Sequence, residues 1–396
     1  MQDMTTPKEP HAPRAHRRTH VIANVALVFL SILAALVLAE IVLRVAPIPG
    51  VSFHSFYYDD VTGGRYYPNS TFTYRNDRGD YVARKVNSWG YLDEEHALAK
   101  APGTVRIGFF GDSYTQAAQV PLEETFFRLI EHALNRAQRA AGRAAKRYQA
   151  LSFGVSGYCT LQSYLESHRW MDRTDLDYVV YVFVENDPGD HIPIIKRSDE
   201  VPFPRMSGDT IVVDDSFNQR YAYKASRLHR LQQAVKAHSL VVSTAVSRLK
   251  LLRKHGVKTS VTPEERQMAV KGDKTQIPDP GWAPSTWPDS LRDQAAELTR
   301  RVMHKWANEV RRSGRRFIVL YIPREREMAK PYAEQDTWAA WFMATCEAEG
   351  IPVVDPSPYL LERKAGGEEI FYDHLAANGH GAVADAFVDF FESAER

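Results

Sequence analysis

The stretch that decides the fold is TVRIGFFGDSYT, residues 104–115. It begins with a short apolar run of the kind that forms a buried strand, and Gly111, Asp112 and Ser113 are residues typical of a turn. A helical stretch follows from about residue 122 to residue 147, where apolar side chains recur at helical spacing. This pattern predicts a strand, a turn and a helix in succession, with Ser113 at the carboxyl end of the strand.

The same alternation continues towards the C-terminus. Further strands are expected at 148–153, 178–184, 317–322 and 351–354, and helices near 160–172, 289–312, 331–348 and 380–393. Apolar strands that alternate with helices are typical of a parallel sheet covered on both faces. Between about residues 196 and 287 the alternation gives way to a polar stretch, a helix near 226–253 and a Pro-rich run. We interpret this region as an insertion.

The N-terminal region indicates a membrane anchor. Residues 21–39 form a run of 19 residues without a charge, enough to cross most of a hydrocarbon core of about 30 Å. Lys8, Arg14, Arg17 and Arg18 precede it, so the positive-inside rule places the N-terminus in the cytoplasm and the rest in the periplasm or outside the cell. A cleaved signal peptide is the alternative, with Val37-Leu38-Ala39 as its cleavage site.

We therefore expect a basic cytoplasmic tail (1–20), a transmembrane anchor (21–46), an extended approach segment (47–103) and one α/β domain (104–396) that contains the insertion. The chain has 50 Lys+Arg against 49 Asp+Glu, so no net charge attracts nucleic acid. The two cysteines, Cys159 and Cys346, are too few for a disulfide scaffold or a cysteine zinc site and allow at most one bridge.

Two more turns follow predicted strands. Gly157 lies in FGVSGY after the second strand, and Asn186 lies in VEND after the third. The carboxyl ends of parallel strands meet at one edge of a sheet, so both residues are expected near Ser113. The N–H groups of Ser113 and Gly157, with the Asn186 side-chain amide, would form a three-donor oxyanion hole. Taken singly, each turn is also ordinary turn material.

His374, in the loop before the last helix, is the candidate general base, because acyl transfer by serine needs a base within hydrogen-bonding reach. Asp373 is the candidate carboxylate that orients it. His380 is interpreted as a surface or capping residue, and the polar residues at 187–191 as loop residues beside Asn186. No third ligand near the two histidines suggests a metal site, and no metal or organic cofactor is expected.

With these residues in order, the sequence resembles the SGNH or GDSL hydrolase superfamily of serine esterases and acyltransferases. The residues that carry the resemblance are Gly111-Asp112-Ser113, Gly157, Asn186 and His374. It implies a flavodoxin-like α/β/α sandwich and the roles given above. The segment Asn87-Ser88-Trp89-Gly90-Tyr91 is also similar to membrane-anchored bacterial members, many of which are associated with cell-surface polysaccharides.

One position departs from the family pattern. The family usually places its aspartate two or three residues before the histidine, where this chain has Tyr372 and Phe371, while Asp373 is directly adjacent. Neighbouring side chains in extended backbone point to opposite sides, so Asp373 can orient His374 only in a tightly turned loop. Glu368, Glu369 or Asp355 are substitutes, and a Ser-His dyad is a further alternative.

The leading hypothesis is a membrane-anchored serine esterase that removes an O-acyl group, above all acetyl, from a carbohydrate or cell-surface polysaccharide. A polysaccharide O-acetyltransferase with the same site is the runner-up. A third reading is a non-catalytic glycan-binding or assembly component of an export system, in which Trp282 and Trp287 of the insertion present a surface to a sugar or a partner. Polysaccharide export or modification proteins are the partners that these hypotheses allow.

Overall fold

A computed structural model describes residues 14–45, 55–76, 78–142, 146–196, 198–256, 284, 287–328, 337–372 and 374–394. At its centre is a parallel sheet with the strand order β11-β10-β7-β5-β6. The strands are β5 (Thr104–Gly111), β6 (Arg147–Gly154), β7 (Tyr178–Phe183), β10 (Arg316–Tyr321) and β11 (Val353–Val354). Numbered along the chain within the sheet, this is the flavodoxin-like order 2-1-3-4-5. The predicted fold class is confirmed.

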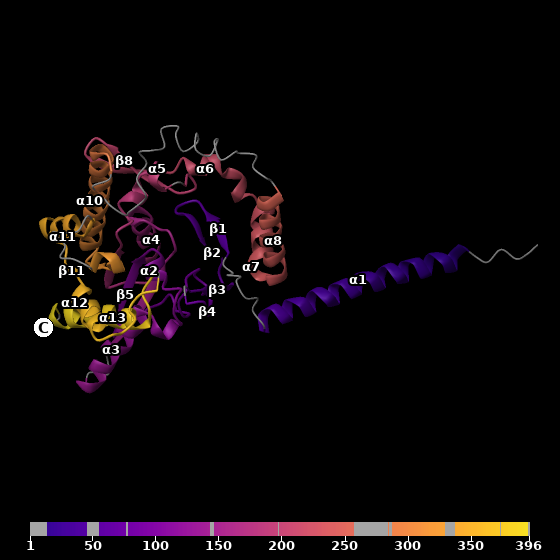
Figure 1. Cartoon of the computed structure of the whole chain (residues 1–396), viewed down its shortest axis with the longest axis horizontal. Helices are drawn as coiled ribbons and strands as arrows, with labels where there is room; N and C mark the ends of the chain where they lie inside the picture. Colours follow the sequence, from indigo (N-terminus) through magenta and orange to yellow (C-terminus); the bar gives the residue numbers. More distant parts are fainter. Residues whose placement is uncertain are drawn as a thin grey trace, which may run out of the picture.

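Helices cover both faces of the sheet (Figure 1). Phe110 belongs to the apolar cluster that contains side chains of α4, α10 and α11, and Phe109 to the cluster that contains side chains of α3, α12 and α13. Side chains alternate along a strand, so each strand feeds both layers, which explains the nearly continuous apolar runs. The helices are α3 (Phe126–Ala140), α4 (Thr160–Trp170), α10 (Asp289–Arg312), α11 (Ala339–Ala348), α12 (Ser357–Ala365) and α13 (Ala377–Ala394).

The sheet topology positions the candidate site. The first strand of the sheet, β5, lies between the second, β6, and the third, β7, so the chain reverses its direction of travel across the sheet at this point. In open α/β sheets, ligands bind beyond the carboxyl ends of the strands at such a switch point. Ser113 follows β5, Gly157 follows β6 and Asn186 follows β7. The fold therefore brings the three predicted loops to the same edge.

The described part of the 47–103 segment is not the extended approach that the sequence suggested. It forms two antiparallel hairpins, β1 (Phe56–Asp59) with β2 (Gly63–Tyr66) and β3 (Thr71–Arg75) with β4 (Tyr81–Lys85). A buried ionic network joins the first hairpin to α4: the guanidinium of Arg65 lies 3.2 Å from Glu166, and Arg169 makes two hydrogen bonds to Asp59. Strands of four or five residues are too short to give a visible period, which explains the difference.

The described part of the insertion also has regular structure. It contains the hairpin β8 (Phe203–Ser207) and β9 (Thr210–Asp214) and the helices α5 (Pro193–Lys196), α6 (Phe217–Arg220), α7 (Arg227–His238) and α8 (Leu240–Gly256). The single helix expected near 226–253 is two helices, because the chain becomes extended at Ser239, whose hydroxyl accepts the N–H of Val242. Trp287 is buried against Trp338, whereas Trp282 lies outside the described residues.

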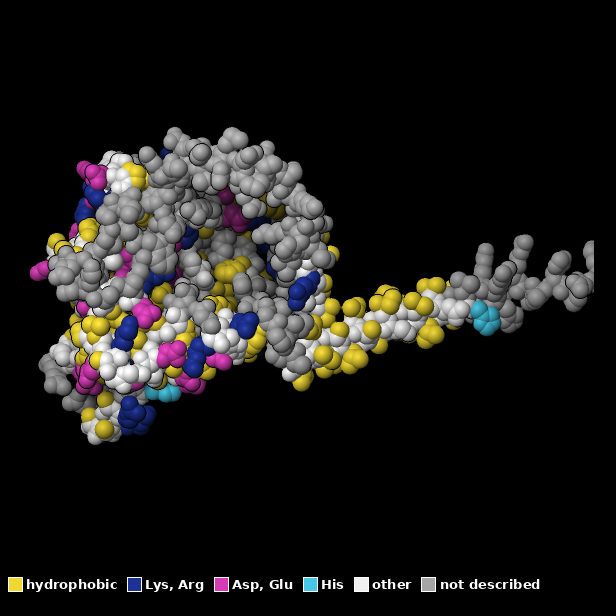
Figure 2. All heavy atoms as spheres, in the orientation of Figure 1, with side chains coloured by type: hydrophobic (Ala, Val, Ile, Leu, Met, Phe, Trp, Pro, Cys, Tyr) yellow, Lys and Arg dark blue, Asp and Glu magenta, His cyan; other side chains and the backbone are white. Residues whose placement is uncertain are grey.

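The N-terminal helix α1 (Arg14–Val45) stands clear of the globular part. Its segment Ile22–Val45 is long and apolar enough to cross a membrane. Figure 2 shows apolar side chains along the visible face of this helix, whereas acidic and basic side chains mix on the visible face of the globular part. A helix of this kind near the N-terminus is typical of a membrane span and also of a signal sequence.

The C-terminal end of α1 contacts the insertion. The Glu40 carboxylate accepts the backbone N–H groups of Leu240 and Val241, at 3.0 and 3.1 Å, and the Ser239 hydroxyl at 3.0 Å. Arg44 pairs with Glu40 and donates to the His238 carbonyl at 2.9 Å. A carboxylate at a helix N-terminus satisfies free N–H groups and the positive end of the helix dipole, so Glu40 stabilises the start of α8.

Candidate active site

Ser113 lies at a sharp strand-to-helix turn. It is the first residue of the short helix α2 (Ser113–Gln116), and Asp112 caps this helix by accepting the N–H of Tyr114 at 2.9 Å. The end of β6 packs directly on α2. A Cβ at Gly154 would lie 2.3 Å from the backbone nitrogen of Gln116, so only glycine allows this approach. The half-buried Ser113 is thereby fixed at the edge of the sheet.

His374 meets Ser113 across the site. Its Nε2 lies 2.8 Å from the Ser113 hydroxyl oxygen, within hydrogen-bonding distance. The Tyr114 ring packs on the imidazole with ring centroids 4.5 Å apart, which limits its rotation. A serine hydroxyl in contact with an imidazole nitrogen is the arrangement required for a base-activated nucleophile.

The loop that carries His374 is tightly turned. Phe371 pairs with Leu375 in an isolated antiparallel bridge, and the N–H of Tyr372 donates to the His374 carbonyl at 2.7 Å. Asp373 itself lies outside the described residues, so its role as the orienting carboxylate stays a prediction.

The three substitute carboxylates each have another partner. Glu368 and Glu369 pair with the guanidinium groups of Arg363 and Arg78, at 3.7 and 3.2 Å. Asp355 accepts the N–H of Ser357 at the start of α12. None of these contacts is with His374, so they do not favour any of the three carboxylates over Asp373 as the group that orients His374.

The two remaining oxyanion-hole candidates lie on neighbouring loops of the same edge. Gly157 has a φ of +77°, a left-handed conformation that favours glycine, and open space surrounds the position of a Cβ. The amide of the half-buried Asn186 donates one hydrogen bond to Asp190 Oδ2 at 3.1 Å. An amide nitrogen carries two hydrogens, so a second N–H is available for an oxyanion.

A lysine that sequence reasoning missed connects these two loops. Lys196 Nζ donates to the Gly157 carbonyl at 2.6 Å and to Asp190 Oδ2 at 2.8 Å, and this same carboxylate oxygen accepts from Asn186. Burial opposes the charged form of Lys196, but the Asp190 carboxylate, with other nearby acidic groups, outweighs it and the pKa of Lys196 is raised. The charged Lys196 therefore helps to fix the relative positions of Gly157, which it contacts directly, and Asn186, which it reaches through Asp190.

Lys196→Met is expected to lower kcat roughly tenfold, less than the 10²–10³ lost when an oxyanion donor itself is removed. KM should change little, because the two donors matter most in the transition state. Ester hydrolysis and the melting temperature of the full chain check this, with Lys364→Met, which removes an exposed ion pair to Glu325, as the control. Partial recovery in Lys196→Arg supports a positioning role, whereas an unchanged kcat in folded Lys196→Met contradicts it.

The polar residues after Asn186 were interpreted as loop residues; they do lie in a loop, and Asp187, Asp190 and His191 are buried in it. Asp187 is buried and accepts the Tyr181 hydroxyl at 2.6 Å, and burial together with the nearby charge of Asp112 raises its pKa well above the usual range. Burial lowers the pKa of His191 to about 3, and its Nδ1 lies 2.9 Å from the Thr299 hydroxyl. A neutral His191 thus helps to hold the loop on α10.

His380 is also buried rather than on the surface. Its Nδ1 accepts the N–H of Phe126, the first residue of α3, at 3.3 Å, and burial lowers its pKa to about 3. The capping role is thus found on a helix far away in sequence. Within the described part of the chain, no group of three His, Cys, Asp or Glu side chains is placed to hold a metal ion, and Cys159 and Cys346 are free, buried thiols.

Apart from Asp373, the candidate residues form two linked pairs that lie at one edge of the sheet. Ser113 and His374 are in contact, and Lys196 and Asp190 link Gly157 with Asn186. Burial raises the pKa of Asp112, beside Ser113; the nearby charge of His374 acts to lower this pKa and that of Asp190 acts to raise it. The strand order and the helices on both faces of the sheet give the chain a flavodoxin-like α/β/α fold, the fold that the resemblance to SGNH hydrolases implied.

Comparison with known proteins gives matches to solved structures. The chain is similar to an acetyl xylan esterase (12% identity, TM-score 0.35, 72% of this chain and 99% of that chain covered). It is also similar to a putative lipolytic protein of the G-D-S-L family from Desulfitobacterium hafniense (8% identity, TM-score 0.35, 72% and 98% covered) and to a two-domain esterase active on acetylated mannans (11%, 0.33, 73% and 49%). No family model and no curated protein matches the sequence. Likeness at this level says nothing of activity, which has to come from the chain's own residues.

Proposed function

We propose that the protein is a membrane-anchored serine esterase that removes a small O-acyl group, above all acetyl, from a carbohydrate. The observation that carries the proposal is the 2.8 Å contact between the Ser113 hydroxyl and His374 Nε2 at the switch point of the sheet. A buried structural serine needs no imidazole partner, and a binding surface needs no nucleophile. The contact therefore favours catalysis over a non-catalytic glycan-binding or assembly role.

The reaction has two steps in this proposal. The Ser113 oxygen attacks the ester carbonyl while His374 Nε2 takes its proton, and the N–H groups of Ser113 and Gly157 with the Asn186 amide stabilise the oxyanion. The C–O bond to the sugar then breaks, and His374 returns the proton to the leaving alkoxide. A water molecule, deprotonated by His374, attacks the acyl-enzyme and releases the carboxylic acid and free Ser113.

The carbohydrate substrate and the membrane location are the finer parts of the proposal. The similarity of Asn87-Ser88-Trp89-Gly90-Tyr91 and the following strand to membrane-anchored members associated with cell-surface polysaccharides supports both. The apolar segment Ile22–Val45 of α1, with basic residues before it in the sequence, supports a single span with the site in the periplasm or outside the cell. Export or modification proteins for polysaccharides remain proposed partners.

The proposal predicts that the full chain reacts with a fluorophosphonate probe and hydrolyses p-nitrophenyl acetate. Peptide mass mapping should find the adduct on Ser113, because the activated oxygen attacks phosphorus as it attacks an ester carbonyl. A protein that neither labels nor hydrolyses would overturn the catalytic reading. An esterase and an O-acetyltransferase would form the same acyl-enzyme and differ in what receives the acyl group. With one acyl donor and an added glycan, an esterase should release acetate, whereas an O-acetyltransferase should acetylate the glycan.

A further inference from the structure

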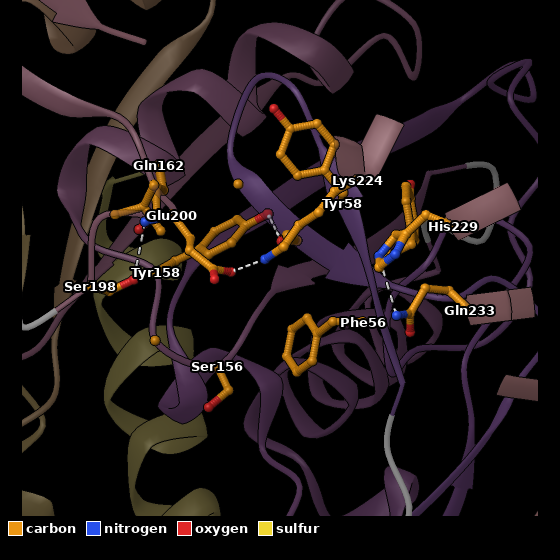
Figure 3. A pocket seen from close by; sticks show the side chains of 15 residues that line it. Phe56, Tyr58, Ser156, Tyr158, Gln162, Ser198, Glu200, Lys224, His229 and Gln233 are labelled. Carbon is orange, nitrogen blue, oxygen red and sulfur yellow. Dashed lines mark hydrogen bonds and ion pairs between the residues drawn. The ribbon is translucent and has the colours of Figure 1, made fainter. Parts of the chain in front are cut away.

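A cavity of about 320 Å³ adjoins the candidate active site, and the catalytic reading leaves it unused. The first hairpin, the loop after β6 and the insertion together form its walls. Figure 3 shows His229 and Gln233 reaching in from α7 on one side, with Tyr158 and Glu200 on the other and Phe56 between them. Its volume is at the small end of the range for ligand pockets, about 300 to 1,000 Å³.

The cavity shares one residue with the proposed oxyanion hole. Ser156 and Gly157 line it, and Gly157 is the residue whose N–H is assigned to the oxyanion. The Tyr66 hydroxyl holds this loop against the nucleophile's helix, since it accepts both from the Ser156 backbone and from the Gln116 amide, the latter at 2.6 Å. A ligand in this cavity therefore lies against the same loop as the reacting ester.

The lining favours a neutral ligand that carries hydroxyl groups. Its ionic residues Glu200 and Lys224 pair with each other, so neither leaves an uncompensated charge for a phosphate or a carboxylate. Gln233 Nε2 lies 3.3 Å from His229 Nε2, and both side chains are partly buried. Amide and imidazole groups donate as well as accept hydrogen bonds, as sugar hydroxyls require.

Aromatic side chains supply another part of the wall. Those that line the cavity are Phe56, Tyr57, Tyr58 and Tyr158. All four have a flat apolar face, and the three tyrosines also carry a polar hydroxyl group. A long acyl chain would need a wall without the amide, imidazole and charged groups, because it leaves such groups without hydrogen bonds. The mixture of aromatic and neutral polar groups fits the faces and edges of a sugar ring.

We propose that this cavity is a saccharide subsite, in which a sugar unit of the esterified chain binds beside the reacting acyl group. This inference rests on the proposed function, because it assigns the carbohydrate part of that ester substrate to a place. The first hairpin and the insertion, which lie outside the α/β core, then determine specificity, and the core supplies the chemistry.

Gln233→Ala and His229→Ala test the subsite in the full chain in detergent micelles. Each removes a hydrogen-bonding group and is expected to lower kcat/KM on an acetylated pentasaccharide about threefold to tenfold. The change should lie in KM, while hydrolysis of p-nitrophenyl acetate, which has no sugar, stays unchanged. Gln232→Ala, an exposed neighbour on the same helix, is the matched control. Acetylated xylopentaose, mannopentaose and cellopentaose are the substrates.

Several results would overturn the subsite. One is an equal loss of activity in the Gln233→Ala and His229→Ala variants on the acetylated pentasaccharide and on p-nitrophenyl acetate. A second is no loss in these variants on a pentasaccharide that the wild type hydrolyses. A third is faster hydrolysis of p-nitrophenyl palmitate than of p-nitrophenyl acetate by the wild type. Calorimetric titration of the unacetylated pentaoses separates this proposal from the esterase itself. Binding that Gln233→Ala weakens, without any hydrolysis, supports the subsite and contradicts the esterase. Hydrolysis of p-nitrophenyl acetate without hydrolysis or binding of any pentaose would support an esterase and contradict the saccharide subsite.

Discussion

Ser113→Ala is expected to lower kcat/KM for p-nitrophenyl acetate by roughly 10³-fold or more, because serine hydrolases lose at least this much without their nucleophile. Labelling by a fluorophosphonate should disappear in the same variant. The proposed oxyanion donors Gly157 and Asn186 remain in this variant, so a small residual rate above that in water is expected. The hydroxyl is small and only half buried, and the melting temperature should stay close to that of the wild type.

A matched control for this variant is Ser313→Ala, an exposed serine at the end of α10 whose hydroxyl donates to the Val310 carbonyl. It should leave both the rate and the labelling unchanged. Persistence of both signals in Ser113→Ala would show that another residue is the nucleophile, and the adduct found by mass mapping would then identify it.

His374→Ala is expected to have a loss of similar size, roughly 10³-fold or more, since the base and the nucleophile act as one unit. Without the 2.8 Å partner the Ser113 hydroxyl keeps its proton, so fluorophosphonate labelling should slow together with ester hydrolysis. The double variant Ser113→Ala/His374→Ala should be no slower than Ser113→Ala alone. Stopped-flow labelling and steady-state hydrolysis check both statements.

His132→Ala serves as the control for the histidine variant, because this side chain is exposed and lies 3.8 Å from Glu123, away from the site. If the losses of the two single variants multiplied in the double variant, Ser113 and His374 would act independently. That outcome would contradict the shared proton transfer even if each single variant were slow.

The sheet was predictable because its strands carry their own signal. Buried runs such as Tyr178–Phe183, in which every residue is buried, read as strands without any knowledge of their neighbours. The hairpins of the N-terminal segment were missed because strands such as Phe56–Asp59 have only four residues. Their stability comes instead from distant partners, such as the ion pair between Arg65 and Glu166.

The same distinction applies to the site. Ser113, Gly157, Asn186 and His374 lie at strand ends or before a helix, where position along the chain indicates position on the sheet. Lys196 gave no signal, because it ends the four-residue helix α5 and one of its partners, Gly157, is 39 residues away. The burial of His191 and His380 could not be predicted, because the sequence does not show which histidines become enclosed by other elements.

The joint between α1 and α8 has a mechanical consequence. Glu40 accepts three hydrogen bonds, from Ser239 and the first two residues of α8, and Arg44 adds a fourth contact, to the last residue of α7. With α1 in a membrane, these contacts would hold the insertion, and the α/β domain that contains it, close to the lipid. Esters near the membrane surface would then be within reach of the domain, whereas esters further out in a polymer would be reached only when the polymer moves towards the membrane.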